Sequence, residues 1–144
     1  MKLSLEVLTK HGFNRRILTE KDFYEICESE KITVLEMDVF TSFYMSAAGR
    51  HFIVLKKRLK GLRKTFAMFH ELAHHFLHGG RESPNAFYFG LIESKQEIEA
   101  DAMATIALVP KFMLDSYDFL EEHPNRYARQ LFKNRQKLEF LYGI

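Results

Sequence analysis

The stretch Phe66–His78, FAMFHELAHHFLH, contains the five residues around which the chain is organised, HELAH. His70 and His74 are four positions apart, so on an α-helix both imidazoles lie on one face, about 6 Å apart along the axis. Two imidazoles at this spacing suit a single tetrahedral Zn²⁺. Glu71 lies about 100° further round the helix, where its carboxylate can reach a water on the metal without being a ligand. The pattern predicts a metal-binding helix.

The residues that flank this motif indicate that the helix is buried. Apolar side chains recur at helical spacing and would form one face toward a core: Phe66, Phe69, Ala73, Phe76 and Leu77. A surface helix that matched the motif by accident would lack this face. The alternative is a chance match, because a short motif with three fixed letters does occur by chance and a histidine on an apolar face is more often a satisfied core residue. A third ligand would decide between the two.

The composition is that of a single domain, which we expect to span residues 1–144. The chain has 144 residues, 47% of them hydrophobic, with 14 Phe and no Trp. It has no apolar run long enough to span a membrane and no signal-peptide core at its N-terminus, so we expect a cytoplasmic protein. Cys27 is the only cysteine, so a zinc site must use histidine and carboxylate ligands. The net charge of +2 is too small to indicate nucleic acid as a partner.

Local patterns before the metal helix predict one helix and three strands. Thr19 and Asp22 resemble a capping box that begins a helix over residues 20–30. Segments rich in β-branched and apolar residues then predict strands over 32–40, 41–47 and 50–55. We expect the last of these, which immediately precedes the metal helix, to form an edge of the sheet where an extended peptide could add as a further strand.

The second half of the chain is predicted to be helical. The metal helix runs over 62–78 and ends at Gly79-Gly80, and a loop with an aromatic cluster at 87–89 follows. A second helix over 94–108 ends before Pro110, and residues 111–144 show helical periodicity in two pieces. The expected fold class is α+β, in which a small three-stranded mixed or antiparallel sheet packs on a zincin-like metal helix and a second ligand-bearing helix, with further helices at the C-terminus.

The second helix offers a third ligand. Glu97 and Asp101 are four positions apart and therefore share a helical face. Ala100 and Ala104 are small enough to let this helix lie close to another, as a shared metal site requires. A competing interpretation is local, because Ser94 with Glu97 also fits a capping box in which the glutamate folds back onto the start of the helix.

These segments together resemble a known family. The strings FHELAHHFLHG, EIEADAMA and ALVP resemble the ImmA/IrrE family of zinc metallopeptidases, whose pattern is HELxH, then ExxA[ND]xFA, then a leucine-rich stretch closed by proline. The match is strong over about residues 49–110. Met103 stands where the family usually has phenylalanine, which is a small change in packing.

The resemblance implies a role for each residue of the site. It implies zinc ligands at His70, His74 and Glu97, with Glu71 as the catalytic base. Asp101 would hold one of the ligands in place through a hydrogen bond. One Zn²⁺ is expected, although Mn²⁺ or Fe²⁺ could occupy a site with two histidines and one glutamate. Three protein ligands leave a fourth position for water, which is typical of a catalytic zinc site.

Two further sets of residues bear on the site. Related zinc peptidases use a histidine or tyrosine to stabilise the oxyanion, and the candidates here are His51, Tyr88 and Tyr117, among which the sequence does not choose. His78 shares a face with His70 and His74, but eight residues of helix separate it from His70 by about 12 Å. One zinc ion with bonds near 2 Å cannot bridge that distance.

The sequence leaves three functions to compare. The first is a zinc endopeptidase, and the resemblance implies that it cleaves a specific regulatory protein, often a helix-turn-helix repressor encoded beside it in a mobile element or stress operon. The second is a non-catalytic zinc-binding regulatory or antitoxin-like interaction module, which would have no need of Glu71. The third and weakest is a nucleic-acid-binding regulator that uses the basic stretches Lys56–Lys64 and Arg126–Lys137.

Overall fold

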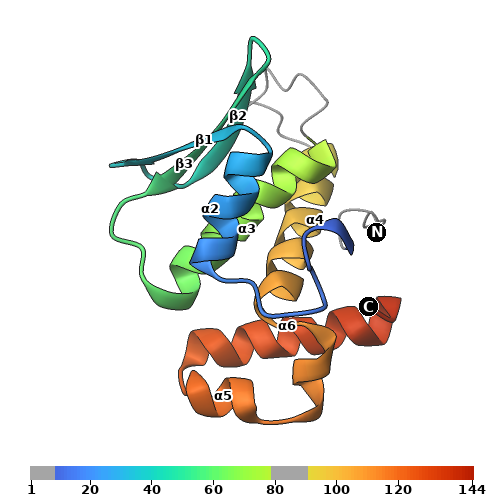
Figure 1. Cartoon of the computed structure of the whole chain (residues 1–144). Helices are drawn as coiled ribbons and strands as arrows, with labels where there is room; N and C mark the ends of the chain where they lie inside the picture. The colour runs from blue at the N-terminus through green and yellow to red at the C-terminus, as the bar shows by residue number, and fades with distance from the viewer. Residues whose placement is uncertain (1–8, 79–90) are drawn as a thin grey trace.

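The computed structural model describes residues 9–78 and 91–144, in which a three-stranded sheet lies against a group of helices (Figure 1). A second group of helices, at the C-terminus, packs at the far end from the sheet. In chain order the elements are α2 (Glu20–Ser29), β1 (Ile32–Met37), β2 (Phe43–Ala47), β3 (Arg50–Lys56), α3 (Gly61–His78), α4 (Leu91–Leu108), the 3₁₀ helix η1 (Lys111–Asp115), α5 (Asp118–Glu122) and α6 (Arg126–Tyr142).

The structure confirms the predicted α+β fold class. Of the two helix N-caps that the sequence suggested, one is present and one is not. At the start of α2 the backbone N–H of Asp22 donates to the hydroxyl of Thr19 at 3.3 Å, and the N–H of Thr19 donates to the Asp22 carboxylate at 2.8 Å. This is the predicted capping box. Helix α4 begins at Leu91, three residues earlier than predicted, so Ser94 lies inside the helix. The interpretation of Ser94 as a cap is therefore wrong.

The sheet has the strand order β1-β3-β2, with β1 parallel and β2 antiparallel to β3. A two-residue turn joins β2 to β3, and Ala48 and Gly49 both have positive φ, as a tight hairpin turn requires. The expectation that residues 50–55 form an edge strand is wrong, because β3 is the central strand. Its apolar run from Phe52 to Leu55 suits a strand with a neighbour on each side, and β1 and β2 form the two edges.

Helix α3 occupies the centre of the molecule, in contact with the sheet on one side and α4 on the other. Phe69, Leu72 and Ala73 of α3 are fully buried, which confirms that the motif lies on a core helix. Ala100 and Ala104 of α4 are also fully buried. The small side chains on α4 are consistent with close approach of the two helices, which brings their residues to a common point.

The C-terminal helices are attached to the rest of the chain through a buried arginine. Arg135 of α6 is fully buried, and its Nε donates to the carbonyl of Val109 at 2.6 Å. Its Nη2 donates to the side-chain oxygen of Asn14 at 3.0 Å and also to the carbonyl of Ile144. One side chain thus connects the segment before α2, the end of α4 and the end of the chain.

We expect Arg135→Ala to lower the free energy of unfolding by about 3 kcal/mol or more, because it leaves buried carbonyls without donors and creates a cavity. Urea denaturation followed by circular dichroism measures the change. Lys133→Ala is the matched control, since Lys133 is an exposed cation on the same helix, and its effect should stay within about 0.5 kcal/mol. Equal effects of the two substitutions would contradict a structural role for Arg135.

Candidate metal centre

The two motif histidines direct the same nitrogen toward a common point. Nε2 of His70 and Nε2 of His74 lie 3.3 Å apart. Two nitrogens bound to one tetrahedral zinc at 2.0–2.1 Å would be about 3.3–3.4 Å apart. The spacing of the two imidazoles in α3 therefore fits a single zinc ion without rearrangement.

Glu97 of α4 lies 27 positions after His70 in the sequence, and its carboxylate approaches the same point from a third direction. Its Oε2 lies 2.9 Å from Nε2 of His70, and its Oε1 lies 2.9 Å from Nε2 of His74. The contacts with both histidines lower the pKa of Glu97, so the carboxylate is charged. The structure thus brings together the three side chains that the sequence predicted, from two helices.

Glu71 is buried beside these groups, with 5% of its surface exposed. Its Oε1 lies 3.7 Å from Nε2 of His70, while its Oε2 is buried and has no hydrogen-bond partner among the described residues. Burial raises the pKa of Glu71 to about 7, although His70 and His74 oppose the shift. A carboxylate with a pKa near neutral, and with a buried oxygen that makes no hydrogen bond to the described residues, suits proton transfer with a bound water.

The outward nitrogen of each imidazole lies close to a polar side chain. Nδ1 of His70 lies 2.8 Å from Oδ1 of Asp101, and Nδ1 of His74 lies 3.1 Å from Nδ1 of His78. Such contacts orient a metal-binding imidazole and fix which nitrogen faces the ion. His78 thus contacts a motif histidine from the side away from the common point, as expected for a residue that is not a ligand.

The electrostatics of the site favour a cation. Burial opposes a positive charge on His70, but the neighbouring Asp101 and Glu97 outweigh this effect and raise its pKa to about 10. Glu97, which faces Nε2 of His70, would attract a metal ion in place of a proton on that nitrogen, while Asp101 faces the outward Nδ1. His70, Glu71 and His74 also form a group whose ligand atoms lie within 4.8 Å of one another, as a metal site requires.

A comparison with protein families identifies the chain at this point. The model of the IrrE N-terminal-like domain, Peptidase_M78, matches residues 27–136, which is most of the chain. The chain belongs to the IrrE N-terminal-like domain family. A comparison with curated proteins found no match. Membership of Peptidase_M78 supports a metallopeptidase-type function, and the match extends beyond the 49–110 region in which the resemblance is strongest.

The contact between Asp101 and His70 predicts an effect on metal binding in this Peptidase_M78 domain. Asp101→Ala should weaken zinc binding about tenfold to a hundredfold, because the His70 ring loses the group that orients it. Competition against a chelating dye measures the affinity. Asp115→Ala removes an exposed carboxylate from η1 and should leave the affinity unchanged. A weakening of the same size in both variants would mean that only the net charge matters.

A second polar cluster on the sheet side of α3 was missed by the sequence analysis. The hydroxyl of Tyr44 lies 2.6 Å from Nδ1 of His51 and 3.1 Å from Nδ1 of His75. Nε2 of His75 lies 3.3 Å from the Glu30 carboxylate. Strand β2 supplies the tyrosine, β3 supplies His51, and α3 supplies His75. The alternation of β2 could have placed Tyr44 on the inner face, but nothing local in the sequence indicates that it reaches α3.

The three candidate oxyanion residues are placed differently by the fold. The ring of His51 packs edge-on against that of His75, 4.8 Å away, so His51 lies next to the metal helix. Tyr117 lies at the start of α5, is 75% exposed and is not brought into either polar cluster. Tyr88 lies outside the described residues.

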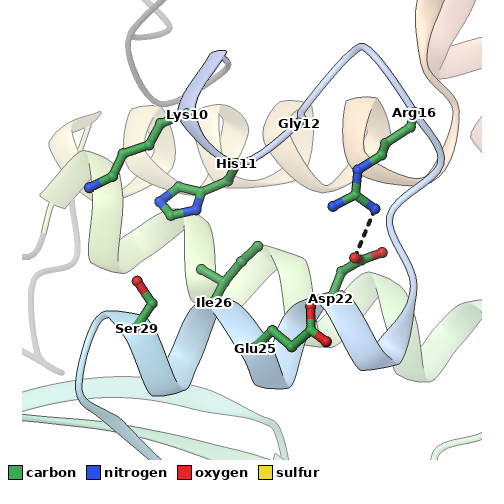
Figure 2. A pocket seen from close by; sticks show the side chains of 8 residues that line it. All are labelled: Lys10, His11, Gly12, Arg16, Asp22, Glu25, Ile26 and Ser29. Carbon is green, nitrogen blue, oxygen red and sulfur yellow. Dashed lines mark hydrogen bonds and ion pairs between the residues drawn. The ribbon is translucent and has the colours of Figure 1, made fainter.

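An open pocket of about 360 Å³ lies between residues 10–16 and α2, and no residue of the metal centre lines it (Figure 2). Lys10, His11 and Arg16 extend into it from one side. The guanidinium of Arg16 is held by the Asp22 carboxylate at 2.8 Å, so the opposite charges compensate each other.

None of the helices within residues 9–78 and 91–144 combines the length and the apolar character needed to cross a bilayer.

Proposed function

We propose that this IrrE-like chain is a zinc-dependent endopeptidase that acts in the cytoplasm on a specific regulatory protein, such as a helix-turn-helix repressor. The observation that carries the peptidase proposal is the buried oxygen of Glu71 that has no hydrogen-bond partner among the described residues, beside two histidines and Glu97. Family membership supports a peptide substrate. The repressor rests on the resemblance of the motifs alone.

In the proposed site, His70, His74 and Glu97 would hold one zinc ion, with Mn²⁺ or Fe²⁺ as alternatives. A bound zinc ion would supply Lewis-acid chemistry, which polarises a peptide carbonyl and lowers the pKa of a water. Asp101 would keep the His70 ring in the orientation that its 2.8 Å contact gives it.

Glu71 would perform the proton transfers. Its carboxylate accepts a proton from the attacking water, and its pKa of about 7 allows it to return that proton to the leaving amine. Burial shields Glu71 from bulk water, and its Oε2 has no hydrogen-bond partner among the described residues, so this oxygen is available to a water in the site. His51 is the candidate that we retain as an oxyanion donor, because its ring packs against the metal helix.

An extended substrate would bind along the edge of the sheet at β2. Strand β2 is antiparallel to β3 and has no neighbour on its other side among the described strands. Its Tyr44 contacts His75, the residue after His74, so this edge lies near the metal helix. Backbone hydrogen bonds to an edge strand hold a peptide without strong selectivity for side chains. This proposal replaces the edge that the sequence analysis expected at β3.

The alternative is a non-catalytic zinc-binding module that acts as a regulator or antitoxin-like partner. Such a module needs the three ligands but gains nothing from the further, buried carboxylate of Glu71, whose desolvation costs stability. The presence of Glu71 with an unpaired oxygen therefore favours the enzyme.

The proposal is tested by mixing the purified chain with a candidate repressor and following fragments by mass spectrometry. Cleavage should stop when the metal is removed with a chelator and return when one equivalent of Zn²⁺ is added. A candidate that binds the chain but is never cut, with zinc bound at full occupancy, would favour the interaction module. Cleavage that persists after metal removal would refute the zinc mechanism.

A further inference from the structure

The face of the sheet that points away from the helices is apolar and exposed. Side chains alternate along each strand, and Ile53, Leu55 and Val34 point to the core while the residues between them point outward. The apolar residues among these outward side chains form what we call the outer face: Leu35, Met37, Phe43, Met45, Phe52 and Val54. Thr33, the partner of Phe52 on β1, also points outward. Val54, on the central strand, is itself buried, with 4% of its surface exposed, whereas Leu35, Met37, Phe43 and Met45 are exposed. None of the six packs in the core cluster beneath the sheet.

The register of the strands makes this face continuous. Leu35, Val54 and Phe43 are cross-strand partners in one row, and Phe52 is paired with Met45 in the next. Leu35 and Met45 are more than two-fifths exposed, and Phe43 is 39% exposed. Phe40, in the loop after β1, is 95% exposed. Single exposed apolar residues are common on proteins, but adjoining rows of them on a sheet mark an interaction surface.

The central strand adds a second reason to expect a cover. Strand β3 lies between β1 and β2, so both of its edges are paired. The uninterrupted apolar run from Phe52 to Leu55 is also typical of a strand buried on both faces. Helices α2 and α3 cover the inner face, and no described helix lies on the outer one (Figure 1).

The size of the outer face fits one helix better than a second copy of the chain. Three strands about 4.8 Å apart and five residues long give a footprint of about 240 Å². Each partner in a stable dimer buries about 800 Å². An α-helix of 12 residues is about 18 Å long and about 10 Å wide, so one helix of three to four turns covers this footprint.

The charges around the face define the chemistry of the partner. Lys56 ends β3 on the outer face, exposed Lys57 and Arg58 follow it, and Arg50 lies at the opposite end. No described carboxylate forms an ion pair with any of these four cations, and Asp38 in the loop after β1 offsets one charge. Two copies stacked on this face would bring cations together at both ends, which is repulsive.

We propose that the outer face binds an amphipathic helix of another protein, with apolar residues against the sheet and acidic residues beside Lys56, Lys57 and Arg50. The flexible side chains of Met37 and Met45 can adapt to such a helix. The outer face points away from the metal centre, and although it shares β2 with the edge proposed for the substrate, the binding of a helix to it requires no peptidase activity.

Two synthetic 18-residue helical peptides test the proposal. Both carry the same leucine stripe, and the stripe is flanked by glutamate in one and by lysine in the other. Fluorescence anisotropy with the full chain should show at least tenfold tighter binding of the glutamate peptide. Phe43→Ser should weaken that binding at least tenfold. Phe140→Ser, which changes an 89% exposed phenylalanine on α6, should leave it unchanged.

Reversing the charge of two lysines beside the outer face provides an independent test. Lys56→Glu combined with Lys57→Glu leaves the apolar rows intact and should reverse the preference toward the lysine peptide. Equal binding of the two peptides by the unmodified chain, or equal losses in the Phe43 and Phe140 variants, would overturn the proposal. Thermal unfolding of each variant confirms that the fold is retained.

The proposal would also be overturned if the outer face bound a second copy of the chain or a membrane surface. A dimer in sedimentation velocity that Phe43→Ser dissolves would assign the face to a second copy of the chain. Binding to vesicles with 30% phosphatidylserine that Phe43→Ser abolishes, without binding of either peptide, would assign it to a membrane surface.

Discussion

Glu71→Gln is expected to leave the fold and zinc affinity nearly unchanged and to lower the rate of peptide cleavage about a thousandfold. Glutamine has almost the same shape as glutamate, so it fits the buried position without a clash. It cannot accept a proton from the attacking water, and general-base catalysis typically contributes 10²–10⁴ in rate. Single-turnover cleavage of a substrate, measured with the zinc content of each sample, gives the rate.

Glu99→Gln provides the control for this experiment. Glu99 is a carboxylate on α4 near Glu97 in the sequence, but it takes no part in the contacts of the metal centre. Its substitution should leave the rate within about twofold. If Glu71→Gln cleaves at the normal rate, Glu71 is not the base and the proposed mechanism is wrong.

Glu97→Ala is expected to weaken zinc binding by more than the tenfold to hundredfold that loss of an orienting residue produces. This side chain contacts both motif histidines at 2.9 Å, and its removal leaves two imidazoles without the third ligand from α4. Competition against a chelating dye gives the affinity, and circular dichroism tests whether the helices persist. Cleavage should be lost together with the metal.

The same variant distinguishes two ligand sets. His70, His74 and Glu97 are the proposed ligands, but His70, Glu71 and His74 also lie close enough together to hold an ion. We favour Glu97, because its carboxylate oxygens lie 2.9 Å from Nε2 of His70 and of His74. Oε1 of Glu71 lies 3.7 Å from Nε2 of His70. If Glu97→Ala binds zinc as tightly as the unmodified chain, Glu71 is a ligand and cannot be the free base.

Most of the elements could be predicted because their signals are local. The capping box at Thr19 and the apolar stripe around His70 each depend on residues within a few positions of one another. Such patterns reflect backbone geometry and the burial of one helical face, so they can be interpreted without the rest of the fold.

The main predictions that failed concern where an element lies in the fold, and not whether it is a helix or a strand. Strand β3 was recognised, but it is central because β1 and β2, joined by a five-residue loop, both pair with β3 and not with each other. A strand's own residues do not specify its neighbours. The contact of Tyr44 with His75 was missed for the same reason, since 31 positions separate the two residues.

The sequence alone determined that two imidazoles share one face of a buried helix with a glutamate beside them, because helical periodicity places residues four apart together. The match to Peptidase_M78 then assigned the chain to a family of metallopeptidase type. Only the tertiary structure decided that Glu97 reaches both imidazoles, that Glu71 retains an unpaired buried oxygen and that one sheet face is left apolar and exposed. These features arise from packing between segments far apart in the chain, which the spacing of residues within a segment does not specify.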